Sequence, residues 1–311
     1  SISHRGLPLQ IAGAISVKML SDLLKAEGLD FEKIGQRMER GENVSTPLIS
    51  TLQSSYTTQH QDFTSYNIIG KIEGSDAQLK NEYVVHTAHL DHLGIGKAVN
   101  GDSIYNGAHD NASGVACSLE MARIYANLKE KPKRSVLFVI VTAEEMGLLG
   151  SAYFAAHPTV PKGTIVANVN TDMPTIIAPL ESISALGAEH SSLSTVVAQA
   201  AKALKLGVEP DLEPKEGRFV RSDQYSFVRA GIPALHVKYG SKTSLPNFNL
   251  LESVKKWREA TYHKTADNFN GGTFYWSAGR KYAQLNFLIG YLIAQNPARP
   301  AWIKGDFFEV K

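Results

Sequence analysis

SVLFVIVTAEE, residues 135–145, joins an uninterrupted apolar run to a pair of carboxylates. The run, Val136 to Val141, has the length of a buried strand and falls far short of the roughly 20 residues that a bilayer-spanning helix requires. A strand that is apolar on both faces is typical of a parallel sheet with helices on each side. We therefore expect residues 135–142 to form a buried strand whose carboxyl end leads to Glu144 and Glu145.

Strand-like and helix-like segments alternate along the chain on both sides of this run. The expected strands lie near 66–73, 82–88, 164–170, 182–186 and 234–238, and the expected helices near 114–128, 144–150, 191–206, after 222 and 275–295. Such alternation is typical of α/β proteins. The sequence thus predicts a three-layer α/β fold with a mixed, largely parallel central sheet flanked by helices.

The first 62 residues follow a different pattern. Residues 14–27 have apolar side chains at helical spacing that stop at Gly28, whereas residues 41–62 are polar and have no clear period. We interpret residues 1–62 as an appendage or linker, and residues 63–311 as the main domain.

The composition restricts the kinds of ligand the chain can bind. With 43% apolar and 20% charged residues, the 311-residue chain is typical of folded globular proteins, and a net charge of +2 argues against an electrostatic nucleic-acid binder. The single cysteine, Cys117, allows neither an internal disulfide nor a cysteine-rich zinc module. Any metal site must therefore use histidine, aspartate and glutamate.

Histidine, aspartate and glutamate residues lie just after several of the expected strands. Ligand sites of open α/β sheets collect at the carboxyl ends of strands. Five groups lie at these ends or in nearby loops: His89, Asp110, Glu145, Asp172 and His263. Two imidazoles and three carboxylates are enough for two zinc ions if one carboxylate bridges them. Glu144 would repel Glu145 unless a cation neutralises one of them, and this suggests Glu145 as a ligand and Glu144 as a general base.

Three other histidines lie near these groups without being assigned to the metals. His86 falls within a strand, His92 follows Asp91, and His109 precedes Asp110. We expect them to be core or rim histidines.

Several segments together resemble one family, the M28 zinc metallopeptidases with two co-catalytic zinc ions. They are AHLDHLG (88–94), NGAHDNASG (106–114), TAEEMGLLGS (142–151), NVNTDM (168–173), RSDQYSF (221–227), AGIPA (230–234) and YHKTAD (262–267). The similarity extends from about Tyr66 to Gln295. It implies the fold of zinc-dependent exopeptidases, also called phosphorylase/hydrolase-like, and it identifies residues 1–62 as the remnant of a protease-associated insert.

The resemblance also implies roles for the metal-binding residues. Asp110 is expected to bridge two zinc ions, with His89 and Asp172 completing the protein ligands of one, and Glu145 and His263 those of the other. Glu144 would be the general base toward a metal-bridged water, and Tyr262 would stabilise the oxyanion.

Further residues are implied around these ligands. Asp91 is expected to orient His89, and Ser222 or Asp267 to orient His263, with Asp223 in the same surroundings. Asn111 follows Asp110 where the family has a cis peptide bond, and Met173 begins the loop that helps to form the substrate pocket.

The function these residues predict is an aminopeptidase that hydrolyses peptides with a free N-terminus. Alternatives are a metallocarboxypeptidase or dipeptidase of the same family, a glutaminyl cyclase with one zinc, and a non-catalytic binding module. Kinship and a start at Ser1 without methionine favour a secreted or periplasmic protein after signal removal. We expect neither a nucleic-acid partner nor a transmembrane segment, and the oligomeric state stays open.

Overall fold

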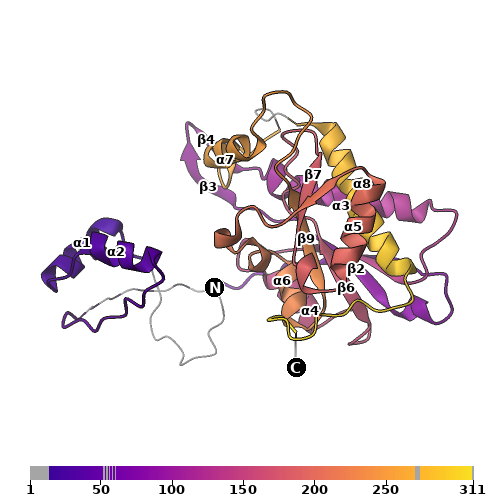
Figure 1. Cartoon of the computed structure of the whole chain (residues 1–311), viewed down its shortest axis with the longest axis horizontal. Coiled ribbons are helices and arrows are strands. Elements are labelled where there is room, and N and C mark those ends of the chain that lie inside the picture. Colours follow the sequence, from indigo (N-terminus) through magenta and orange to yellow (C-terminus); the bar gives the residue numbers. More distant parts are fainter. Residues whose placement is uncertain are drawn as a thin grey trace. The chain divides into compact units, whose positions relative to one another are not determined.

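The computed structural model describes residues 14–51, 53, 55, 57, 59, 61–269 and 274–309. The chain divides into two compact units, Ser1–Phe63 and Thr64–Lys311 (Figure 1). Parts of both predicted domains lie outside the described residues: 1–13 and the even-numbered positions from 52 to 60 in the first, and 270–273 and 310–311 in the second. The interpretation of the first unit as an appendage or insert remnant stays a prediction.

The first unit contains two short helices, α1 (Val17–Ala26) and α2 (Phe31–Glu39). Both begin at side-chain caps, because Ser16 Oγ accepts a hydrogen bond from Met19 N and Asp30 Oδ1 accepts one from Lys33 N. The predicted helix over 14–27 is therefore confirmed as α1, whereas α2 was not predicted.

The second unit is built on a seven-stranded sheet in the order β1-β5-β2-β6-β9-β7-β8. Its strands are β1 (Ile68–Ile72), β2 (Tyr83–His89), β5 (Ser135–Val141), β6 (Ile165–Asn170), β7 (Ser182–Leu186), β8 (Gly207–Glu209) and β9 (Ala234–Tyr239). Only the β1–β5 and β7–β9 pairs are antiparallel. The predicted mixed, largely parallel sheet is confirmed.

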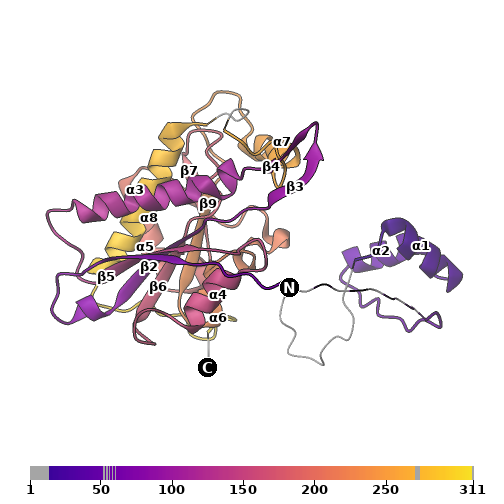
Figure 2. The same ribbon diagram turned by 180° about the vertical axis from the view of Figure 1, so that it is seen from behind.

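Helices cover both faces of this sheet, as the alternating side chains of β5 require. Val136 and Phe138 pack in the cluster with α3 (Ser113–Ala126), α5 (Leu193–Ala203) and α8 (Trp276–Gln295). Leu137, Val139 and Val141 pack in a second cluster with α4 (Leu149–Ala156) and α6 (Gln224–Arg229). Figure 2 shows α3 and α8 crossing the same face. The three predicted layers follow from this period of two.

Other elements differ from the sequence prediction. A hairpin of β3 (Gly94–Val99) and β4 (Asp102–Tyr105), the edge strand β8 and helix α7 (Leu250–Thr261) were not predicted. The helix predicted over 144–150 begins only at Leu149, because Ala143 and Leu148 adopt left-handed conformations. Glu144 and Glu145 therefore lie in a loop before α4. Within the described residues, no helix has the length and apolar character that would let it span a membrane.

Strand register explains why the predicted ligands can meet. In the parallel pairs, His89 of β2 lies beside Val141 of β5, and Thr87 lies beside Asn170 of β6. The three strands therefore end at the same edge of the sheet, and the loops carrying Glu145 and Asp172 leave from that edge together with His89.

Helix α3 approaches this edge closely at Gly114. A Cβ atom built on Gly114 would overlap Asn111 Oδ1 and lie 2.5 Å from the carbonyl oxygen of Thr171. The position therefore requires glycine so that the helix, the loop before it and the end of β6 can pack together.

We expect Gly114→Ala to lower the free energy of unfolding by about 1–3 kcal/mol, because the methyl group overpacks this junction. Gly279→Ala in α8 is the matched control, since its Cβ would meet Ile176 only at 3.7 Å, and it should stabilise the protein by less than ~1 kcal/mol. Urea unfolding followed by circular dichroism measures both. Equal stability of the two variants would contradict the close approach at Gly114.

Candidate metal centre

The carboxylate of Asp110 lies between the two predicted histidine ligands. Its Oδ1 is 3.2 Å from His89 Nε2, and its Oδ2 is 3.2 Å from His263 Nε2. Asp110 is buried, as is His89, whereas His263 is about one-third exposed. One carboxylate thus presents a different oxygen to each imidazole, which is the arrangement that a bridging ligand needs.

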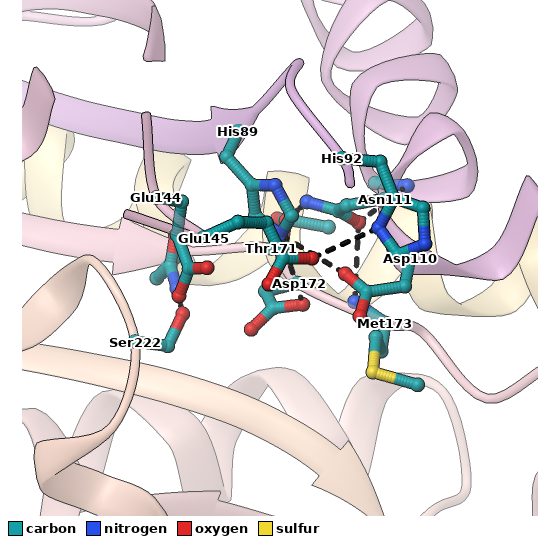
Figure 3. A network of polar contacts seen from close by, with 12 residues as sticks. His89, His92, Asp110, Asn111, Glu144, Glu145, Thr171, Asp172, Met173 and Ser222 are labelled. Carbon is teal, nitrogen blue, oxygen red and sulfur yellow. Dashed lines mark hydrogen bonds and ion pairs between the residues drawn. The ribbon is translucent and has the colours of Figure 1, made fainter. Parts of the chain in front are cut away.

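The remaining two predicted ligands complete the cluster (Figure 3). Asp172 Oδ1 lies 3.5 Å from His89 Nε2, and Glu145 Oε2 lies 3.2 Å from His263 Nε2. Ligands at ~2.0–2.2 Å from a tetrahedral zinc are separated by about 3.3–3.6 Å. The observed separations are close to this range, so the five residues fit two zinc ions.

Burial supports the same interpretation. Asp172 Oδ1 is buried and has no hydrogen-bond partner among the described residues, which is costly for a carboxylate unless a cation lies next to it. Two groups of potential ligand atoms among the described residues lie close enough together for a metal: His89, Glu144 and Asp172 in one, and His92, Asp110 and Glu145 in the other. These groups include Glu144 and His92, which were not predicted as ligands, and they omit His263.

The loop that carries Asp110 is held by Asp267. The two carboxylate oxygens of Asp267 accept hydrogen bonds from the backbone N–H groups of His109 (2.9 Å) and Asp110 (3.0 Å). The prediction that Asp267 orients His263 is therefore corrected: its carboxylate binds the loop of the bridging ligand. Sequence could not reveal this, because the partners are backbone amides.

Asn111 fixes the other side of that loop. Its Nδ2 donates to the Thr171 carbonyl (3.0 Å), and its Oδ1 accepts from the backbone N–H groups of Met173 and Gly114 (3.1 Å each). The Asp110–Asn111 peptide bond is cis, as the resemblance implied. Asn111 thus ties the loop of Asp110 to the loop that carries Asp172 and to the start of α3.

Asp91 contacts His89 through its backbone. The Asp91 carbonyl oxygen lies 3.0 Å from His89 Nδ1, whereas the Asp91 carboxylate is 3.8 Å away. Because a carbonyl only accepts, Nδ1 carries a proton, and Nε2 is the ring nitrogen that would face a metal. The carboxylate instead accepts the backbone N–H groups of Glu144 (3.1 Å) and Glu145 (3.2 Å). The predicted orienting role therefore falls on the Asp91 backbone.

The neighbouring glutamates have opposite electrostatic environments in the metal-free chain. Burial, together with the negative charge of Asp172, raises the pKa of Glu144 to about 9. Burial alone would also raise the pKa of Glu145, but hydrogen bonds from His263 and His92 lower it to about 2. Two carboxyl groups with separated pKa values suit the roles of proton carrier and metal ligand.

Tyr262 packs directly on a predicted ligand. Its ring stacks on that of His263 with 3.9 Å between centroids, and the Arg258 guanidinium lies 4.7 Å from the Tyr262 ring centroid. Burial raises the pKa of Tyr262 to about 12, so the phenol keeps its proton at neutral pH and can donate a hydrogen bond.

The other predicted surrounding residues lie near the centre in different ways. Ser222 accepts a hydrogen bond from Asn170 Nδ2 (2.8 Å) and lies near Glu144 in Figure 3, so the expected contact with His263 is corrected. Asp223 is fully buried, and burial raises its pKa to about 7. Met173 is buried beside Asp110 with a left-handed backbone (φ 46°).

Several of the described residues at the centre were not assigned to it from the sequence. His92 Nδ1 lies 2.8 Å from Glu145 Oε1, and the H-x-D-H spacing of residues 89–92 was a signal that could have identified it. The His109 ring is buried and stacks on the ring of Phe274, and its Nδ1 lies 3.4 Å from Asp267 Oδ1. Lys238 Nζ donates to the backbone carbonyl of Asp172 (2.8 Å), and a lysine within a strand gives no such signal. His86 is a buried core histidine, as expected.

Comparison with known sequences gives consistent results. The profile of peptidase family M28 matches residues 67–285, a range that contains all five predicted ligands. A probable zinc metalloprotease of Pyrenophora teres f. teres is 26% identical over 275 residues, which cover 76% of this chain and 53% of the relative. Aminopeptidase YwaD of Bacillus subtilis is 35% identical over 127 residues, 40% of this chain and 24% of the relative. The chain therefore spans about half the length of the first relative.

Solved structures share the fold. A zinc aminopeptidase from Bacillus subtilis matches with a TM-score of 0.52 at 21% identity, covering 75% of this chain and 51% of that chain. The glutaminyl cyclase of Porphyromonas gingivalis matches with a TM-score of 0.52 at 19% identity, and the match covers 74% of this chain and 77% of that chain. At these identities the likeness concerns the fold alone.

The metal-free centre predicts a stability that depends on pH. Hydrogen bonds to Asp110 and Glu145 raise the pKa of His263 to about 10, from an ordinary value of 6.5. The folded chain keeps this proton where the unfolded chain has lost it, so the stabilisation is complete below pH 6.5 and disappears between pH 6.5 and 10. The raised pKa of Glu144 acts in the same direction up to about pH 9.

We therefore expect the melting temperature of chelator-treated protein to fall between pH 6.5 and 9.5, and zinc to reduce this fall because the metals replace the protons. Differential scanning calorimetry with chelator and with zinc measures both. A chelator-treated protein whose melting temperature rises over this range would contradict the assignment.

Proposed function

This chain belongs to peptidase family M28, a family of zinc metallopeptidases, and we propose that it is an aminopeptidase that removes residues from peptides with a free N-terminus. The observation that carries the proposal is the Asp110 carboxylate, which directs one oxygen to each of two histidines at 3.2 Å. Because the chain spans about half of its first relative, the activity is argued from the residues of this site.

The proposed enzyme holds two zinc ions. His89 and Asp172 would hold one ion, Glu145 and His263 would hold the other, and Asp110 would serve both. Paired zinc ions lower the pKa of water toward neutrality and polarise a carbonyl group. The protein's part is to hold the donor atoms at this spacing before any metal arrives, through Asp267, Asn111 and Asp91.

Glu144 is the proposed general base and acid. Its backbone N–H is held by the Asp91 carboxylate, and its carboxyl group lies within reach of His89 and Asp172. In the metal-free chain, burial and the negative charge of Asp172 raise the pKa of this carboxyl group to about 9. Glu144 takes a proton from the attacking water and delivers it to the amine that leaves. The Tyr262 phenol donates a hydrogen bond to the oxygen of the scissile carbonyl as negative charge develops there.

The alternatives have less support. A carboxypeptidase needs a cation for the substrate carboxylate, and two arginines of this region are already paired. Arg218 is buried in ion pairs with Asp211 and Glu213, and Arg221 Nη1 lies 3.8 Å from Glu216 Oε2. A glutaminyl cyclase shares the fold but uses one zinc, whereas all five donors of a two-metal site are present here. YwaD, the relative with 35% identity, is an aminopeptidase.

Zinc stoichiometry tests the two-metal proposal. The purified protein should bind two zinc ions, and Asp110→Ala should lose at least one of them together with nearly all hydrolysis of aminoacyl-anilides. Metal analysis and a colorimetric assay measure this. Fewer than two zinc ions in the wild type, with full activity in the variant, would exclude the proposed centre.

Replacement of Glu144 separates catalysis from metal binding. Glu144→Ala should retain two zinc ions and lose about 10²–10⁴-fold in kcat, because no other described group at the site is proposed to carry the proton. If this variant hydrolyses substrate at the wild-type rate, the role belongs to another residue.

A small substrate panel separates the alternatives. We expect hydrolysis of peptides with a free α-amino group and none of their N-acetylated forms, and no cyclisation of peptides with N-terminal glutamine. Mass spectrometry of the products identifies the bond that is cut. Release of C-terminal residues from N-acetylated peptides would favour the carboxypeptidase, and loss of ammonia from N-terminal glutamine the cyclase.

A further inference from the structure

His92 is an unpredicted residue whose ring contacts the carboxylate of a proposed ligand. We propose that it is a positioning residue for the second zinc: its Nδ1–H holds Oε1 of Glu145 so that Oε2 faces the metal shared with His263. This inference rests on the proposed two-metal site and adds a residue to it.

The two oxygens of Glu145 have different partners. Oε1 lies 2.8 Å from His92 Nδ1, and Oε2 lies 3.2 Å from His263 Nε2. The first separation is that of a hydrogen bond, and it is shorter than the ~3.3–3.6 Å between two ligands of one tetrahedral zinc. The geometry therefore assigns His92 to the carboxylate and leaves the metal to Oε2 and His263.

The proton position follows from the chemistry of the pair. A metal-binding carboxylate is ionised and only accepts hydrogen bonds, so His92 Nδ1 must carry the proton. The other ring nitrogen, Nε2, is buried and has no hydrogen-bond partner among the described residues. The bond to Glu145 is thus the one polar contact that orients the ring within the described part of the chain.

Packing holds the ring in this place. The His92 side chain is 6% exposed, and its ring lies edge-on to that of His263 with 5.6 Å between centroids. Gly107 provides the space, because a Cβ there would lie 2.7 Å from His92 Cγ. The imidazole therefore cannot swing freely away from Glu145.

Two adjacent residues act on Glu145 together. The Asp91 carboxylate accepts the Glu145 backbone N–H (3.2 Å), and His92 binds the Glu145 side chain. Residues 91–92 come shortly after the end of β2, so the segment that begins with His89 at one proposed metal also positions Glu145 at the other. Partners of this kind typically contribute 10–100-fold to metal affinity.

The test compares His92→Asn with His92→Leu. The two side chains branch at the same atom and have the same number of heavy atoms, but only the asparagine amide can donate a hydrogen bond near the position of Nδ1. His157→Ala, which removes an exposed imidazole, is the control for nonspecific zinc binding. Zinc affinities of the intact chain are measured by competition with a chromophoric chelator, and cobalt absorption spectra report the coordination of each site. Thermal unfolding of the metal-free variants checks that they fold.

We expect His92→Leu to weaken one of two zinc sites by 10–100-fold and to leave the other within about threefold. His92→Asn should recover most of this loss with an unchanged cobalt spectrum, and His157→Ala should bind as the wild type does. If His92 acted only through packing, the leucine and asparagine variants would lose the same amount of zinc affinity.

Three results would overturn the proposal. Unchanged affinities in His92→Leu would show that the hydrogen bond does not matter, and equal losses in both variants, with an altered cobalt spectrum, would make His92 a ligand itself. A wild type that binds fewer than two zinc ions would remove the proposed function as well. If the wild type binds two zinc ions, either of the first two results overturns only the role of His92 and leaves the proposed function intact.

Discussion

The Asp110 carboxylate is the contact on which the candidate metal site depends, because it faces two imidazoles that lie far apart in the sequence. His89 ends β2, and His263 follows α7, yet both ring nitrogens lie 3.2 Å from this one side chain. Asp110 itself is fixed through its backbone: Asp267 accepts its N–H, and Asn111 ties the loop to Thr171 and Met173. The sheet brings the ligands to one edge, and this loop sets their spacing.

The charge of the site explains why it needs cations. Five carboxyl groups lie close together and are largely buried: Asp110, Glu145 and Asp172, with Glu144 and Asp223 nearby. Negatively charged carboxylates that are buried side by side repel each other strongly. In the metal-free chain this repulsion is relieved by protons, so the pKa values of Glu144 and His263 are raised. Bound zinc would replace those protons as the neutralising charge. Glu144 could then lose its proton and exchange one with the substrate. Metal binding, stability and catalysis are therefore linked through the same groups.

The sequence predicted the sheet because its buried strands follow a simple pattern, and strand ends together with the M28 resemblance gave the five candidate ligands, which the structure brings together. The apolar run of β5 marks a strand buried on both faces, and parallel strands bring residues such as His89 and Asp172 to one edge. The contacts around the ligands were predicted poorly, because Asp267 and Asp91 bind backbone amides that the sequence does not show. The contact of His92 with Glu145 was not predicted either, because a histidine beside a motif is usually structural and the H-x-D-H spacing alone does not name its partner.

The central claim is that Asp110 bridges two metals, and X-ray absorption at the zinc edge tests it most directly. The zinc-loaded wild type should show a zinc–zinc vector at ~3.5–4 Å, as two-metal sites do. This vector should be absent from Asp110→Ala, while nitrogen and oxygen scattering from the remaining ligands persists. Two bound zinc ions without such a vector in the wild type would contradict the account, because the metals would then occupy separate sites.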